Sequence, residues 1–293
     1  MLLWNASKTV FLMIVLLLLF NASPGLADHK KKELIFGVHP YLHATTLLER
    51  FSPLTEYLGS QMGYHIHIRV ATSYQEHIDA IRQGKVDFAY IGPASYIKLT
   101  EAENVYKLLG RLSFSGKSTF RGAIIIRKDS PFTLLSQLQD KRFAFGDPNS
   151  TLSTLVPQRL LVNAGIELDE LKNATHLKNH HNVALAVLMG KYDAGGIKEE
   201  VFNEYQSRGL KALQWTPDIP SHPFIATPKV PEKQFKQLRD LLQNLHLQTA
   251  DTVNAKRILQ KIKKGTTAII PAHIEEYAEL RKLLSFKPPT NIK

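Results

Sequence analysis

The chain has 293 residues, 44% of them hydrophobic and 22% charged, which is the composition of a globular protein with a sizeable core. Its 37 lysines and arginines outnumber 26 aspartates and glutamates, giving a formal net charge of +11. This surplus favours an anionic partner, whether nucleic acid, acidic lipid or a small anion. The basic residues are scattered and form no nucleic-acid motif, so a small anion is favoured. The absence of cysteine excludes disulfides, thiol chemistry and a lipid-anchored cysteine.

Residues 1–27 have the layout of a signal peptide. Lys8 precedes an apolar run at 10–20, small residues follow as far as Ala27, and the segment has no acidic side chain. The alternative is an uncleaved membrane anchor, but the apolar run is shorter than the ~20 residues that span a bilayer. We therefore expect cleavage after Ala27 and export to a bacterial periplasm.

Strands and helices alternate along the rest of the chain. Apolar runs predict strands at 33–38, 65–70, 85–92, 119–127 and 141–146. Periodic patterns predict helices at 45–61, 74–82, 183–189, 232–246, 251–263 and 272–284. This alternation predicts an α/β fold of βαβ units, with mostly parallel sheets covered by helices.

An internal echo suggests two similar lobes. The stretch AIRQGKVDFAYIG passes from a helix through Gly84 into a strand near Asp87, and AVLMGKYDAGGI does the same through Gly190 near Asp193. Coincidence is the alternative, because a glycine often ends a helix. We interpret the two aspartates as structural contacts at strand starts. If the echo is real, a ligand lies in the cleft between the lobes, beyond the carboxyl ends of the strands.

The proline-rich segment at 216–231 predicts extended or hinge structure that returns the chain to the first lobe. We expect lobe 1 to comprise residues 28–115 and 225–293, and lobe 2 residues 116–224. The two hinge crossings are expected near 113–122 and 216–226.

A cluster of hydroxyls stands between a predicted strand and a predicted helix. The sequence GDPNSTLSTLVP places Ser150, Thr151, Ser153 and Thr154 at this junction. One hydroxyl would cap the helix, whereas several can also hold an anion at the helix N-terminus. Because Pro157 belongs in a first helical turn, we expect the helix to start near Ser153, with Ser150 and Thr151 in the loop.

Four motifs resemble the phosphate, phosphite and phosphonate-binding proteins of ABC transporters. They are ATSYQEHIDAIRQGKVDFAYIGPASYI, FAFGDPNSTLSTLVP, NHHNVALAVLMGKYDAGGI and IPSHPF, and they occur in the family's order over nearly the whole chain. The resemblance implies a type II periplasmic binding protein, with two lobes joined by a two-strand hinge. Such a protein closes over a phosphorus oxyanion and delivers it to an ABC permease.

The resemblance also implies which residues bind the ligand. Tyr74 and the loop with Ser95 and Tyr96 come from one lobe. The oxyanion-binding pair falls on Ser150 and Thr151, with Ser153 as a shifted third donor where many relatives have Ser-Gly. A family histidine falls on His180, although its neighbours differ from the family's Gly-Ser-His-Asp pattern.

Relatives that bind aminoalkyl phosphonates hold the ammonium group with acidic residues. One of these falls on Glu200, with Glu199 as the alternative. The other stands in an Ile-Pro-Ser-Asp-Pro motif, where this chain has His222 instead of the acid. The resemblance therefore does not imply an aminated ligand, because a counter-ion is missing.

Other functions find less support in the sequence. The adjacent His180 and His181 suggest a metal pair, but no further ligand stands at a recognisable spacing. Neither a Ser-His-Asp order nor a metal centre indicates an enzyme. We expect a monomer with no cofactor, no metal and no nucleic-acid partner. A sensor that presents the anion to a membrane receptor or histidine kinase remains the alternative to transport.

Overall fold

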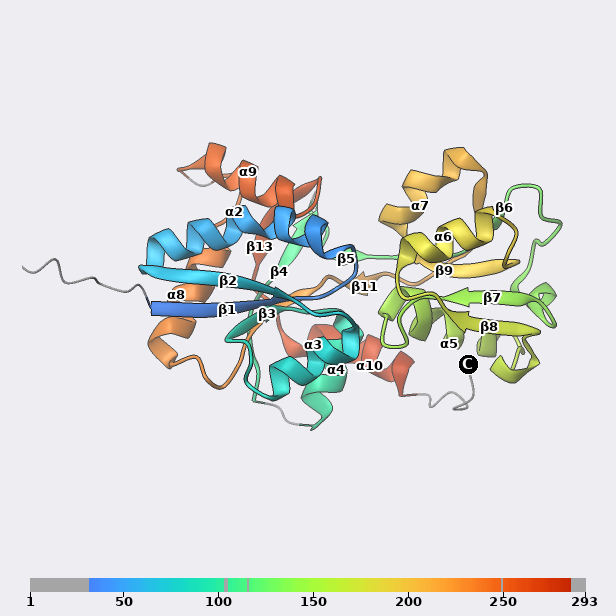
Figure 1. Cartoon of the computed structure of the whole chain (residues 1–293), viewed down its shortest axis with the longest axis horizontal. Helices are drawn as coiled ribbons and strands as arrows, with labels where there is room; N and C mark the ends of the chain where they lie inside the picture. The colour runs from blue at the N-terminus through green and yellow to red at the C-terminus, as the bar shows by residue number, and fades with distance from the viewer. Residues whose placement is uncertain (1–31, 103–104, 115, 249, 286–293) are drawn as a thin grey trace, which may run out of the picture. The chain divides into compact units, whose positions relative to one another are not determined.

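The computed structural model describes residues 32–102, 105–114, 116–248 and 250–285 (Figure 1). The segment at 1–27 that we interpret as a signal peptide lies outside these residues. Two helix-covered sheets build the fold, and a short two-stranded sheet lies where the chain passes between them. The expected α/β class is therefore confirmed.

The elements follow one another in the alternating order that the sequence predicts. The described α-helices are α2 Ala44–Met62, α3 Tyr74–Arg82, α4 Pro93–Ala102, α5 Val156–Asn163, α6 His180–Leu188, α7 Glu199–Tyr205, α8 Glu232–Gln243, α9 Thr252–Ile262 and α10 Ala278–Leu284. The described strands are β1 Lys32–Val38, β2 Tyr64–Val70, β3 Phe88–Tyr90, β4 Lys107–Phe114, β5 Thr119–Phe120, β6 Gly122–Arg127, β7 Arg142–Phe145, β8 Asn173–His176, β9 Ala194–Lys198, β10 Leu210–Trp215, β11 Ile219–Pro220, β12 Pro223–Ala226 and β13 Thr266–Ile270.

The first sheet has six strands in the order β13-β4-β12-β3-β1-β2. Strands β1 and β3 run parallel, whereas β12 runs antiparallel to both β3 and β4. The Phe36 ring stacks on Phe88 and Phe224, with centroids 4.7 and 6.2 Å apart. These three rings join neighbouring strands through a shared core on one face of the sheet.

Helix α2 follows directly from its apolar spacing. Leu47, Phe51, Leu54 and Leu58 recur at intervals of three and four residues, and all four are fully buried. Burying each such side chain contributes about 1.5–3 kcal/mol. Helices α8 and α9 contribute to the same core, whereas α3, α4 and α10 contribute to a second core on the other face.

The second sheet has five strands in the order β10-β6-β9-β7-β8. Strand β7 runs parallel to β8 and β9, while β6 runs antiparallel to β9 and β10. The expectation of mostly parallel sheets is therefore wrong. Strands β6 and β12, which begin where the chain passes from one sheet to the other, form antiparallel pairs in both sheets. Helices α6 and α7 pack on one face and α5 on the other.

The internal echo corresponds to equivalent contacts in the two sheets. Gly84 and Gly190 end their helices with positive φ of 63° and 69°. Asp87 accepts the Ile35 backbone N–H over 2.7 Å, and Asp193 accepts the Arg142 N–H over 2.9 Å. Each aspartate thus joins its own strand start to a neighbouring parallel strand, which confirms the structural interpretation.

The chain passes between the two sheets twice. It leaves β4, forms β5 and enters β6, then leaves β10, forms β11 and enters β12. Strands β5 and β11 pair antiparallel, so the two crossings run side by side. The Ser221 hydroxyl donates to the Leu112 carbonyl over 2.6 Å and anchors the second crossing to the first sheet.

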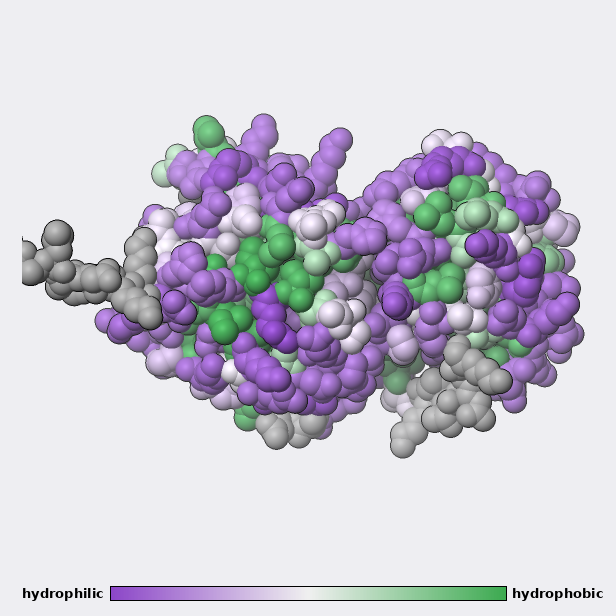
Figure 2. Space-filling model, in the orientation of Figure 1, coloured by the Kyte–Doolittle hydropathy of each residue, from purple (hydrophilic) through white to green (hydrophobic). Residues whose placement is uncertain are grey.

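The surface seen in Figure 2 is mostly hydrophilic, with separate apolar areas over both sheets. Among the described residues, no helix combines the length and apolar character required to cross a membrane.

Candidate functional site

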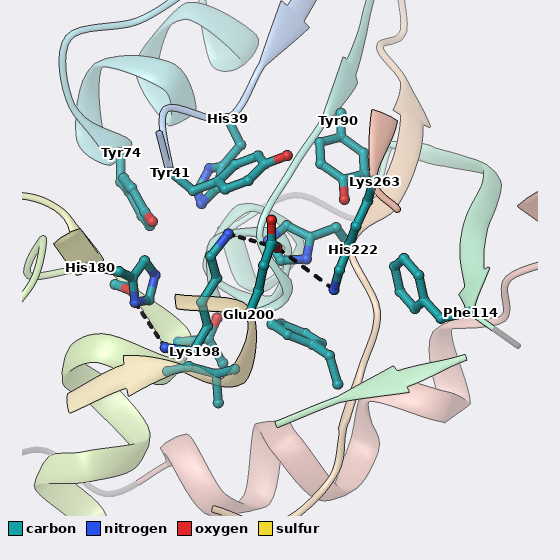
Figure 3. A pocket seen from close by; sticks show the side chains of 14 residues that line it. His39, Tyr41, Tyr74, Tyr90, Phe114, His180, Lys198, Glu200, His222 and Lys263 are labelled. Atoms are coloured by element: carbon teal, nitrogen blue, oxygen red, sulfur yellow. Dashed lines mark hydrogen bonds and ion pairs between the residues drawn. The ribbon is translucent and has the colours of Figure 1, made fainter. Parts of the chain in front are cut away.

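A pocket collects polar and aromatic side chains from both lobes (Figure 3). Its residues follow the carboxyl ends of strands: His39 and Tyr41 follow β1, the 150–152 segment follows β7, and Lys198 ends β9. Ligands of open α/β sheets bind at this edge. The lining residues are His39, Tyr41, Tyr74, Tyr90, Phe114, Phe120, Ser150, Thr151, Leu152, His180, Lys198, Glu200, His222 and Lys263.

Six of the predicted site residues line this pocket. They are Tyr74, Ser150, Thr151, His180, Glu200 and His222. Residues from both lobes, separated by as many as 148 positions in the sequence, therefore meet around one space.

Three predicted residues do not line the pocket. Ser153 donates its hydroxyl to the Gly196 carbonyl over 2.7 Å, so it is turned toward β9. Tyr96 is 1% exposed and packs edge-on against Tyr277, with the ring centroids 5.1 Å apart. The hydroxyl of Ser95 is buried in the first turn of α4, without a hydrogen-bond partner among the described residues. Helix α4 starts at Pro93, and its first turn places Ser95 and Tyr96 among buried residues that do not line the pocket.

The hydroxyl segment begins with a π-helical turn at Thr151–Leu155. Ser150 is its N-cap and accepts the Ser153 N–H over 3.2 Å. The turn ends in α5, whose first turn contains Pro157. The expected start near Ser153 is thus wrong: the wider π turn lets the helix begin at Thr151 while Pro157 keeps a place where no N–H is required.

Two glycines let this turn approach the sheet. A Cβ on Gly196 would lie 3.0 Å from the Ser153 carbonyl and 2.6 Å from the Pro157 ring, and one on Gly146 would overlap the Ser153 hydroxyl. Bare backbone at both positions therefore lets the turn pack closely against β7 and β9. This contact sets Ser150 and Thr151 at the pocket wall.

Thr151 also connects the two lobes. Its hydroxyl oxygen accepts the Ala94 N–H over 3.1 Å, across a sequence separation of 57 residues. The hydroxyl proton remains available for an acceptor in the pocket. Next to it, the Asp147 carboxylate accepts the Tyr74 N–H over 3.2 Å and forms a second connection between the lobes.

His180 is the first residue of α6 and is 4% exposed. Asn179 caps this helix by accepting the Asn182 N–H over 2.9 Å. The Lys198 backbone N–H donates to His180 Nδ1 over 3.1 Å, so in the neutral ring Nε2 carries the proton. Burial, followed by the charge of Lys198, holds the pKa of His180 well below its usual value.

Glu200 is surrounded by three cations. Its carboxylate oxygens lie 3.0 Å from Lys198 Nζ, 3.1 Å from an Arg50 guanidinium nitrogen and 3.8 Å from Lys263 Nζ. Burial would raise the pKa of Glu200, but Lys198, Lys263 and Arg50 together hold it well below its usual range. The carboxylate is thus ionised and fully engaged, and the cluster has a surplus of positive charge.

An aromatic wall closes the pocket where the two crossings meet the first sheet. The His222 ring stacks on Tyr90, with centroids 5.2 Å apart and an interplanar angle of 16°, and lies 4.9 Å from the Phe120 centroid. Burial, followed by Lys198 and Lys263, lowers the pKa of His222 to about 3. His222 is therefore neutral at pH 7.

His39 is a pocket residue that the sequence reasoning missed. It is 2% exposed, and its Nδ1 is buried without a hydrogen-bond partner among the described residues. A buried polar atom without a partner is unfavourable by about 1–3 kcal/mol, and in a pocket it indicates a contact for a ligand. The sequence signal for His39 was its position directly after the first predicted strand. Lys198 likewise stands at the end of the strand that the internal echo predicts near Asp193.

Metal binding has no geometric support in the described part of the chain, where no group of three or more His, Asp or Glu side chains is arranged to hold an ion. His181 faces Glu204, with the ring nitrogen 3.7 Å from the carboxylate, and does not line the pocket.

Two helix-covered lobes joined by paired crossings, with a cationic pocket at their strand ends, define a two-lobed solute-binding protein. The model of the family described as "ABC transporter, phosphonate, periplasmic substrate-binding protein" matches residues 36–277. The chain belongs to this family, which is a family of binding proteins of transporters and not of enzymes.

Individual relatives are similar over most of their length. The phosphonates-binding periplasmic protein of Escherichia coli is 24% identical, with 92% of this chain and 81% of the relative covered. A probable phosphite-binding protein of an ABC transporter from Prochlorococcus marinus is 23% identical, with 84% and 91% covered.

Solved structures show the same fold. A Prochlorococcus marinus protein in complex with methylphosphonate matches with a TM-score of 0.76 at 20% identity, covering 86% of this chain and 97% of that structure. A binding protein component of a phosphonate ABC transporter from Pseudomonas aeruginosa matches with a TM-score of 0.75 at 21% identity, covering 86% and 85%.

Proposed function

We propose that the protein binds a small phosphorus oxyanion, namely phosphate, phosphite or a simple alkylphosphonate, in this pocket and delivers it to an ABC permease. The proposal rests on one observation: neutral hydrogen-bond donors and an excess of positive charge line the same buried pocket. Ser150, Thr151 and His180 supply the donors, and Lys198 and Lys263 supply the charge. The names of the relatives and the methylphosphonate complex of a protein with this fold support the same ligand class.

The donors suit an oxyanion because each can point a proton at it. We assign the Nε2–H of His180, the hydroxyls of Ser150 and Thr151, and the Tyr74 hydroxyl to the oxygens bound to phosphorus. The first turn before α5 adds the positive end of a helix. Hydrogen bonds to a charged group contribute about 1.5–3 kcal/mol each, enough for selective binding by a few residues.

The same charges disfavour an aminated ligand. Glu200 already pairs with Arg50, Lys198 and Lys263, and His222 offers no negative charge. A ligand ammonium group would meet two lysines without a free carboxylate. We therefore propose that 2-aminoethylphosphonate is a poor ligand, whereas Ser95, Tyr96 and Ser153 act through packing and not through ligand contact.

We propose that binding is coupled to closure of lobe 1 (28–115 and 225–293) onto lobe 2 (116–224), with hinges near 113–122 and 216–226. Contacts such as Arg50 with Glu200 and Tyr74 with Asp147 join the lobes and would break on opening. The chain acts as a monomer in this proposal, and residues 1–27 are removed after Ala27 on export.

A calorimetric comparison tests the proposal. Phosphate, phosphite, methylphosphonate, 2-aminoethylphosphonate and sulfate are titrated into the purified protein at one pH and ionic strength. We expect at least one of the first three to bind more tightly than both 2-aminoethylphosphonate and sulfate. Tighter binding of the aminated ligand, or no heat with any phosphorus oxyanion, would overturn it.

A further inference from the structure

A wider outer cavity adjoins the pocket. The inner pocket has a volume of about 40 Å³ and the outer cavity one of about 640 Å³. The two spaces share Phe120, Lys198, Glu200 and Lys263. These four residues therefore lie where the two spaces adjoin, and a group attached to an oxyanion in the inner pocket would meet them first.

The two ends of the inner pocket differ in chemistry. In Figure 3 Tyr74 and His180 lie at one end, whereas Lys263 and Phe114 lie at the other. The first end offers neutral hydroxyl and imidazole donors, and the second offers an ammonium group beside aromatic rings. Lys263 Nζ stands 4.1 Å from the Phe114 centroid, and its side chain is 28% exposed, so it is reachable from both spaces.

The outer cavity is also cationic. Arg121 is paired with Glu199, at 3.0 and 2.8 Å, and Glu200 is shared among three cations. Cationic side chains therefore outnumber acidic ones in the linings of both spaces. The charged lining residues are five cations, Arg50, Arg121, Lys198, Lys263 and Lys264, and three acids, Glu199, Glu200 and Glu204.

We propose, on the basis of the proposed function, that the preferred ligand is a phosphonate whose carbon side chain carries a carboxylate, held by Lys263 and Lys198 at the mouth of the inner pocket. The phosphonate group occupies the hydroxyl and imidazole end. The carboxylate of Glu200 contacts both ammonium groups, but its single negative charge balances only one of the two positive charges. Because Lys198 is buried and Lys263 is only partly exposed, an added carboxylate gains more there than on an open surface.

Three phosphonates of similar size differ in the charge of the group that is attached to the phosphonate. Ethylphosphonate, phosphonoacetate and 2-aminoethylphosphonate carry a neutral, an acidic and a basic group, and calorimetry at pH 8 compares them. We expect phosphonoacetate to bind about tenfold more tightly than ethylphosphonate, since one hydrogen bond to a charged group gives at least that gain. Phosphonoacetate binding no tighter than ethylphosphonate would overturn this inference alone. Failure of all three phosphonates to bind would also overturn this inference, and the proposed function falls with it only if phosphate and phosphite fail to bind as well.

A pair of lysine variants tests whether Lys263 causes the preference for phosphonoacetate over ethylphosphonate. Lys263→Met should clearly lower the ratio of the ethylphosphonate dissociation constant to the phosphonoacetate dissociation constant, with Lys198 left as the remaining partner of the carboxylate. Lys261→Met removes the same charge from an exposed position on α9 that lines neither space, and it should keep the tenfold ratio. A thermal unfolding midpoint of Lys263→Met close to that of the parent shows that the variant is folded. A ratio that is unchanged in Lys263→Met, or equally reduced in Lys261→Met, would contradict the assignment.

Discussion

The backbone N–H of Lys198 donates to Nδ1 of His180 over 3.1 Å, so one residue fixes the tautomer of the histidine while its side chain supplies charge to the same pocket. Strand β9 and helix α6 are thereby combined into one binding surface. The proton on Nε2 is left to face the pocket without any positive charge on the ring.

The first prediction concerns this tautomer. We expect nitrogen-detected NMR of labelled protein to show His180 with Nε2 protonated and Nδ1 unprotonated throughout pH 6–8, because its pKa lies well below the usual value. Ligand affinity should then not require an imidazolium. A doubly protonated ring at pH 7 would contradict this description of the donor.

The second prediction separates binding from capping. Thr151→Ala should weaken binding of methylphosphonate about tenfold to a hundredfold, the equivalent of a hydrogen bond to a charged group. Thr154 is the matched control, because its hydroxyl donates to the Asp147 carbonyl over 2.8 Å and does not line the pocket. Thr154→Ala should lower the free energy of unfolding by about 1 kcal/mol and leave affinity nearly unchanged. Equal affinities of Thr151→Ala and the parent would exclude the threonine as a donor.

The third prediction concerns the link between Asp147 and Tyr74. Asp147→Ala removes the acceptor for the Tyr74 N–H and should favour the open state. Small-angle scattering without ligand should give a larger radius of gyration for the variant, and saturating methylphosphonate should reduce the difference. Identical radii with and without ligand, in parent and variant, would indicate a rigid cleft.

The fourth prediction concerns ligand charge. His222→Asp places a carboxylate beside Tyr90 and Phe120, at the position where an aminated ligand lacks a counter-ion. We expect the variant to improve the affinity for 2-aminoethylphosphonate relative to methylphosphonate, measured by calorimetry. His222→Asn has a similar size without the charge and should not shift the preference. An equal shift in both variants would mean that shape, and not charge, excludes the amine.

The fifth prediction concerns stability against pH. Burial is the main cause that lowers the pKa of His39, His77, His180 and His222, to about 4 for His77. The unfolded chain binds these protons at higher pH than the folded chain, so stability is complete above pH 6.5 and decreases as the pH falls below it. Each pKa unit corresponds to about 1.4 kcal/mol, which gives a loss on the order of 2 kcal/mol at pH 5 for each of His77 and His222, whose pKa values are lowered to about 4 and about 3.

Urea denaturation at pH 7.5 and pH 5 measures this loss. Replacing the exposed His65 by asparagine should leave the difference between the two pH values unchanged. A stability that does not fall between pH 7.5 and pH 5 would contradict the neutral state of these rings.

Much of the fold could be predicted because it depends on local patterns. The apolar spacing of α2 and the runs of β1 and β3 indicate their elements directly. The antiparallel partners of β3 and β6 could not be predicted, since they depend on where a distant segment re-enters the sheet.

The site was predicted where strand ends or family motifs marked it, as at Thr151 and His180. The sequence could not reveal Lys263, because it follows α9 without any motif and reaches the pocket only through tertiary packing. Ser153 was wrongly expected in the pocket because a π turn, which no local pattern announces, directs its hydroxyl to Gly196.

A crystal structure of the protein with methylphosphonate tests the central claim most directly. We predict that the phosphonate oxygens lie at about 2.6–3.0 Å from the hydroxyls of Ser150 and Thr151 and from Nε2 of His180. Both lobes should contact the same ligand, with Tyr74 on the side of the first lobe. A phosphonate group bound instead among the lysines of the outer cavity, with these three donors unoccupied, would contradict the account.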